Sequence, residues 1–116
     1  MSTAAEIARK AAEIASERGH CKGMEEDEHG NVCFIGAVNI AYCGQSERGD
    51  TYDCPEVFDI IEAAARVLAR REGLTVLDGI NYMYSHGPIN YNNKASTSRE
   101  DIILLLKEAA EELEQW

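Results

Sequence analysis

The chain has 116 residues and a formal net charge of −10 at pH 7, from 21 acidic and 11 basic side chains. This length predicts a single helical domain over residues 1–116, whose core buries roughly 65% of the unfolded surface. Nucleic-acid binding depends on Lys and Arg side chains that neutralise phosphates. The charge therefore argues against DNA or RNA as a ligand, and it favours basic protein surfaces.

The pattern of apolar residues predicts a cytoplasmic protein. No apolar stretch approaches the ~20 residues that cross a bilayer, and the first residues lack the apolar core of a signal peptide. We therefore expect no membrane contact. In a reducing cytoplasm cysteines stay as thiols, so no disulfide framework is expected among Cys21, Cys33, Cys43 and Cys54.

Residues 4–18 repeat apolar side chains at helical spacing and predict a first amphipathic helix. Thr3 and Glu6 have the spacing of a capping box, and Gly19 can take the left-handed conformation that ends a helix. Residues 20–31 lack this periodicity and contain an acidic run and turn-forming residues. They predict a loop or a small hairpin.

Residues 32–43 are apolar nearly all round a helical wheel and predict a central buried helix that stops at Gly44. Periodicity cannot separate a buried strand from a buried helix over so few residues. The alternative is a short strand over residues 32–34, paired with residues 20–22.

Residues 45–53 predict an exposed loop, and Pro55 suits the first turn of a helix that runs to about Arg71. Residues 74–97 predict an irregular segment with a short helical turn near 76–82. Ser98 and Asp101 predict the capped start of a last helix over residues 99–114. An apolar stripe of each helix is expected to face the core. In the helix that starts at Pro55 the stripe is Val57, Ile60, Ile61, Ala64, Val67 and Leu68. In the last helix it is Ile102, Ile103, Leu106, Ala109, Ala110 and Leu113.

Leu104 does not fit the stripe of the last helix. At 3.6 residues per turn it projects about 160° from the centre of that stripe. Two explanations stay open. Either the irregular segment before the helix folds over Leu104, or Leu104 contributes to a homodimer or partner interface.

Three motifs carry a resemblance to a known family. They are Arg18-Gly19-His20-Cys21-Lys22-Gly23, then Gly30-Asn31-Val32-Cys33-Phe34-Ile35-Gly36-Ala37, and Tyr91-Asn92-Asn93 ahead of a helix that begins Ser98-Arg99-Glu100-Asp101. The chain resembles a family of small proteins of unknown function from actinobacteria and their phages, with the pattern Arg-Gly-Trp-Cys-x-Gly, Gly-x-x-Cys-x-x-Gly-Ala and Trp-Asn-Asp. His20, Tyr91 and Asn93 depart from that pattern. The resemblance implies a phage or mobile-element accessory protein and no particular chemistry.

The cysteines and histidines offer two candidate chemistries, a metal site and a catalytic thiol. His20, Cys21, His29 and Cys33 could in principle surround a zinc ion, but they lack the tight ligand pair of zinc sites. Cys21, His29 and Cys33 are therefore only weak metal candidates, and the cysteines are expected to pack as small hydrophobic side chains. Cys21 or Cys33 could also be a nucleophile with His86 or His29 as base, yet no local signature supports this. We predict no catalytic residue and no cofactor.

Residues 81–93 are dense in tyrosine and asparagine, a composition suited to recognising a protein or a small ligand. The alternative is structural, with tyrosines covering the core and asparagines in turns and helix caps. The candidate binding residues are Tyr82, Tyr84, His86, Tyr91, Asn92 and, on the last helix, Leu104.

Together these features predict a mainly α fold, a compact bundle of about four helices with an irregular Tyr/Asn-rich segment and a small hairpin. The predicted function is that of a noncatalytic protein-binding module, phage-encoded and directed at a host protein. The alternatives are a protein that sequesters a small, nucleotide-like molecule, with a pocket completed across a homodimer, and a thiol-dependent enzyme.

Overall fold

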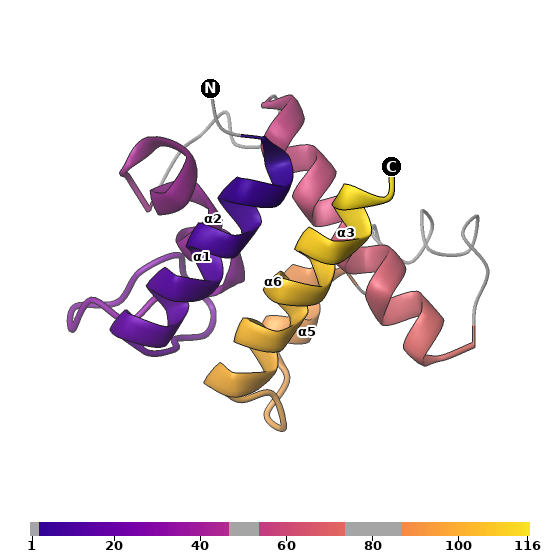
Figure 1. The fold of residues 1–116 in the computed structure, drawn as a ribbon. Coiled ribbons are helices and arrows are strands. Elements are labelled where there is room, and N and C mark those ends of the chain that lie inside the picture. Colours follow the sequence, from indigo (N-terminus) through magenta and orange to yellow (C-terminus); the bar gives the residue numbers. More distant parts are fainter. Residues whose placement is uncertain (1–2, 47–53, 74–86) are drawn as a thin grey trace.

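A computed structural model describes residues 3–46, 54–73 and 87–116, and this part of the chain is mainly helical. Its helices are α1 (Ala4–Arg18), α2 (Phe34–Cys43), α3 (Pro55–Arg71), α5 (Pro88–Asn93) and α6 (Arg99–Glu114). In Figure 1, α1 and α6 lie side by side and antiparallel, α2 packs against α1, and α3 packs against α6. The predicted mainly helical fold is confirmed. Residues 47–53 of the predicted loop at 45–53, and the predicted helical turn at 76–82, lie outside the described residues.

Helix α1 begins and ends as the sequence predicts. Thr3 and Glu6 form the capping box, and the chain leaves the helix at Gly19, whose φ of +89° is strained for any side chain with a Cβ. Four of the five side chains that α1 buries are alanines, which let neighbouring helices pack closely. The five are Ile7, Ala8, Ala11, Ala12 and Ala15.

The second helix starts two residues later than predicted, because Val32 takes part in two isolated β-bridges. Val32 forms a parallel bridge with His20 and an antiparallel bridge with Glu26. The buried helix is therefore confirmed from Phe34 onward, and of the strand alternative only the pairing of Val32 with His20 is present. Cys33 caps α2, since its Sγ accepts a hydrogen bond from the Gly36 N–H at 3.3 Å.

Helices α3 and α6 follow the predicted limits, and the capping box of Ser98 and Asp101 is present. The stripe predicted for α3 is buried throughout. In α6 the stripe is rotated from the prediction: Leu105, which the sequence analysis left out, is fully buried, whereas Ile103 and Leu113 are only partly buried. The short helix α5 was missed, although Pro88 after Gly87 is a normal helix start.

The core lies where α1, α2, α3 and α6 meet. Its largest fully buried side chains include Phe34, Ile60, Ile102, Leu105 and Leu106. Cys21, Cys33 and Cys54 are buried as predicted, but Cys43 is exposed because the last turn of α2 extends beyond the core. Within the described residues, no helix is long and apolar enough to cross a membrane.

Candidate functional site

Asn92 joins three separate segments through its side chain. It is only 1% exposed, and α5 places it beneath the loop that follows α1. Its Oδ1 accepts hydrogen bonds from the Phe34 N–H at 2.9 Å and from His20 Nε2 at 2.8 Å. Its Nδ2 donates to the Cys21 carbonyl at 3.1 Å and to Asn93 Oδ1 at 3.2 Å. An amide oxygen only accepts, so His20 Nε2 must carry the proton, and the buried amide has all its hydrogen bonds.

The two residues after Asn92 extend this attachment. Asn93 Oδ1 accepts a hydrogen bond from the Gly23 N–H at 2.9 Å, and Lys22 Nζ donates to the Lys94 carbonyl. We call the group formed by residues 92–94, residues 20–23 and Phe34 the Asn92 latch. The motifs that carry the family resemblance thus meet in space, and in this protein they hold a loop in place.

Two motif glycines are required by close packing of the same loop. A Cβ on Gly36 would lie 2.0 Å from the carbonyl oxygen of Glu25, and a Cβ on Gly19 would lie 2.5 Å from Asn31 Oδ1. Asn31 is held in turn by Asp27, and its side-chain hydrogen bond is the main cause that lowers the pKa of Asp27. The glycines therefore serve the fold rather than a ligand.

The two motif thiols are buried and poorly suited to nucleophilic chemistry. Burial and the neighbouring Cys33 raise the pKa of Cys21 to about 11, and burial also raises the pKa of Cys33. Cys21 Sγ donates to the carbonyl of Met24 at 3.3 Å. The reactive form of cysteine is the thiolate, so both side chains stay protonated and unreactive near neutral pH.

Cys21 and Cys33 are neighbours, but with His29 they do not form a group that could hold a metal ion. The His29 side chain is 75% exposed and lies 3.4 Å from Glu28, whereas Cys21 and Cys33 are buried. In residues 3–46, 54–73 and 87–116, no three His, Cys, Asp or Glu side chains are grouped so that they could hold a metal ion.

The candidate binding residues of the Tyr/Asn-rich segment fall into two groups. Tyr82, Tyr84 and His86 lie outside the described residues. Tyr91 is partly buried against the core, and Asn92 belongs to the latch. The latch was missed by the sequence analysis, and the only signal for it was the resemblance of these motifs to a family pattern.

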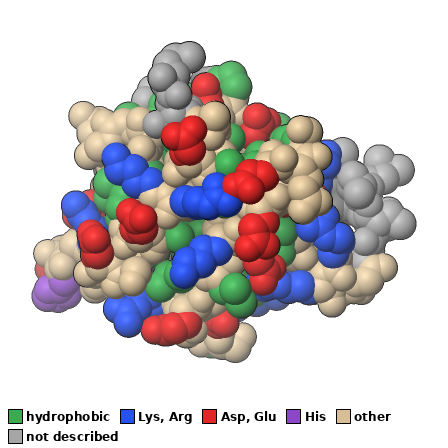
Figure 2. All heavy atoms as spheres, in the orientation of Figure 1, with side chains coloured by type: hydrophobic (Ala, Val, Ile, Leu, Met, Phe, Trp, Pro, Cys, Tyr) green, Lys and Arg blue, Asp and Glu red, His purple; other side chains and the backbone are tan. Residues whose placement is uncertain are grey.

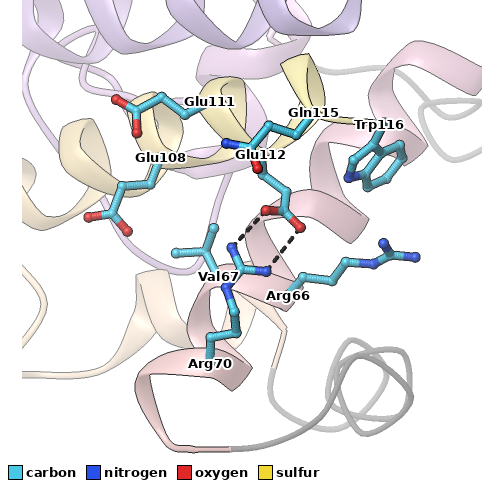
Figure 3. A pocket seen from close by; sticks show the side chains of 8 residues that line it. All are labelled: Arg66, Val67, Arg70, Glu108, Glu111, Glu112, Gln115 and Trp116. Carbon is cyan, nitrogen blue, oxygen red and sulfur yellow. Dashed lines mark hydrogen bonds and ion pairs between the residues drawn. The ribbon is translucent and has the colours of Figure 1, made fainter.

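A hollow of about 700 Å³ lies between α3 and α6 (Figure 3). Arg70 forms two hydrogen bonds with Glu112, at 3.0 and 2.7 Å, and this pairing lowers the pKa of Glu112. The Arg66 guanidinium lies 4.8 Å from the centre of the Trp116 ring. Arg70 is therefore paired with Glu112, whereas Arg66 lies 3.5 Å from Glu62 and its buried Nε has no hydrogen-bond partner among the described residues. The hollow is lined by Arg66, Val67, Arg70, Glu108, Glu111, Glu112, Gln115 and Trp116.

The outer face of α6 carries the most accessible large apolar side chain of that helix. Leu104 is 51% exposed, as its angular position predicts. Beside it, a groove of about 220 Å³ runs between α1 and α6, and Figure 2 shows apolar side chains among charged ones on this face. The groove is lined by Ala12, Glu13, Ser16, Glu17, Ile103 and Lys107.

These features define a small, mainly helical protein whose shared motifs fasten a loop to a helix start. The chain belongs to a family of unknown function, DUF6197, whose model matches residues 1–112. The matched part contains the Asn92 latch and Leu104, and it leaves Trp116 outside. The comparisons matched no curated protein and no solved structure.

Proposed function

We propose that the chain is a noncatalytic protein-binding module whose contact surface is centred on Leu104 of α6. The observation that carries the proposal is the 51% exposure of this leucine in the middle of a helix with a well-formed N-terminal cap. Covering an exposed leucine is worth roughly 1.5–3 kcal/mol in the fully buried limit. Ile103 in the neighbouring groove would extend the apolar contact.

The state of the motif residues supports a noncatalytic role. His20 and Asn92 are hydrogen-bonded to each other in the latch, and the pKa values of Cys21 and Cys33 are raised. A catalytic nucleophile needs a lowered pKa or an adjacent base. These groups instead hold the loop against the start of α2. This structural role supports a protein that acts by surface recognition.

The expected partner is another protein of the host cell, and the chain acts as a phage-type accessory protein. The resemblance of its motifs to a family shared by actinobacteria and their phages supports this context. The formal charge of −10 disfavours a second copy of the same acidic chain as the partner, because the two surfaces would repel each other.

Site-specific photo-crosslinking tests the proposal. A photoreactive side chain is placed at Leu104 in one variant and at Met24 in the control, because both side chains are 51% exposed. The Leu104 variant should crosslink one host protein that the Met24 variant does not, and Leu104→Ser should weaken binding of that purified protein about tenfold. Crosslinks between copies of the chain would identify a homodimer instead. Equal crosslinking from both positions would overturn the proposal.

A further inference from the structure

The groove between α1 and α6 has a charged rim that is not neutralised by its own fold. Glu13 and Glu17 lie four residues apart on α1, so they share one side of that helix. The nearby arginines of α1 are engaged elsewhere, Arg9 with Glu114 and Arg18 with Glu26. Within the described residues, neither glutamate forms an ion pair.

This arrangement is unfavourable in the isolated chain. Two like charges four residues apart destabilise a helix by about 0.2–0.5 kcal/mol. Lys107, across the groove on α6, supplies one positive charge against the two negative ones. The groove is also lined by two apolar side chains, those of Ala12 and Ile103. The groove therefore combines an apolar lining with a net negative rim, next to the exposed Leu104.

We infer that this groove takes a basic, amphipathic segment of the partner, with a lysine or arginine placed between Glu13 and Glu17 and apolar side chains on Ile103 and Leu104. This inference rests on the proposed function, because it specifies the chemistry of the partner at the same surface. The complementarity is electrostatic at the rim and apolar at Ile103 and Leu104. A cation at the rim also removes the repulsion between the two glutamates.

A pair of synthetic peptides tests the inference. The first is an acetylated and amidated helical peptide in which leucines recur at every third and fourth position and lysines fill the other positions. The second has glutamate in place of each lysine. We expect the basic peptide to bind the chain and the acidic peptide not to bind. Failure of the basic peptide to bind, or equal binding of both, would overturn the inference.

Charge-matched variants locate the binding. Glu13→Gln and Glu17→Gln should each weaken binding of the basic peptide about threefold, and raised salt should remove the difference. Glu28→Gln makes the same change in charge on the loop after α1, where the Glu28 side chain is exposed, and it should leave binding nearly unchanged. If all three variants behave alike, the peptide responds only to net charge and the groove is not its site.

Leu104→Ser in the same titration separates the two proposals. If Leu104→Ser weakens binding of the basic peptide but Glu13→Gln and Glu17→Gln have no specific effect, the inference of a basic partner segment is overturned. The proposed contact at Leu104 is then still supported. Weakening by the glutamate variants alone supports the groove and contradicts Leu104 as the centre of the contact.

Discussion

The side chain of Asn92 accepts a hydrogen bond from the backbone N–H of Phe34 at 2.9 Å, across 58 positions of the chain. Phe34 is the first residue of α2, and the first N–H groups of a helix have no partner within the helix. Cys33 satisfies the N–H of Gly36 from within the same segment. The start of α2 is therefore capped from two directions, and one cap is supplied by α5.

Replacing Asn92 by alanine should destabilise the protein by about 3 kcal/mol. The change leaves the Phe34 N–H and the Cys21 carbonyl without their partner in a buried place, and each such group costs roughly 1–3 kcal/mol. Denaturant unfolding monitored by circular dichroism measures the loss. Asn93→Ala is the control, because Asn93 is exposed and its loss should cost less. A loss below about 1 kcal/mol for Asn92→Ala would show that the latch does not stabilise the fold.

Gly36→Ala and Gly30→Ala should destabilise the protein by different amounts for different reasons. A Cβ on Gly36 would lie 2.0 Å from the Glu25 carbonyl oxygen, so the loop must move away from α2. Such overpacking costs about 1–3 kcal/mol or more. Gly30 has open space around it, so an alanine there meets only the strain of a φ of +81°, about 1–2 kcal/mol. Unfolding free energies of both variants check this order, and the reverse order would contradict the packing of Glu25 on α2.

Stability should fall as the pH rises from about 9 to about 11. The pKa of Cys21 is raised in the folded chain from 9.0 to about 11, so in this range the folded state holds a proton that the unfolded state has lost. The stabilisation is complete below pH 9 and disappears as the pH passes the folded value. Urea unfolding from about pH 8 to about pH 11 measures the decline. Cys21→Ala should make the decline shallower, and an unchanged decline in this variant would assign the effect to other groups.

Thiol labelling should separate the exposed cysteine from the buried ones. Near neutral pH, iodoacetamide should modify Cys43 first, because it is exposed, while Cys21 and Cys33 react only when the protein unfolds. Peptide mass spectrometry gives the order of modification. Rapid modification of Cys21 or Cys33 in the folded protein would instead indicate a reactive thiol. That result would support the alternative of a thiol-dependent enzyme.

Helices α1, α3 and α6 could be predicted from the sequence because local signals define them. Thr3 with Glu6, and Ser98 with Asp101, mark helix starts within one turn of chain, and Pro55 does the same for α3. The exposure of Leu104 likewise follows from helical periodicity alone.

The latch could not be derived in this way. The bonds of Asn92 reach residues 58 to 72 positions away, and an asparagine in a polar segment has no local feature that marks it as buried. Val32 forms its bridges with His20 and Glu26, which are close in sequence, and the strand alternative predicted the pairing with His20. The apolar pattern alone does not show that α2 begins only after this bridge. Cys43 was wrongly placed in the core because an apolar run does not show where a helix leaves it.

The most direct test of the account is the affinity of a Leu104→Ser variant for the host protein that crosslinks at position 104, measured alongside its unfolding free energy. Because Leu104 is exposed, the unfolding free energy should stay within about 1 kcal/mol of the original chain, whereas the same change at the buried neighbour Leu105 should cost at least about 3 kcal/mol. Affinity should fall about tenfold. Unchanged affinity in a variant that folds normally would contradict Leu104 as the centre of the binding surface.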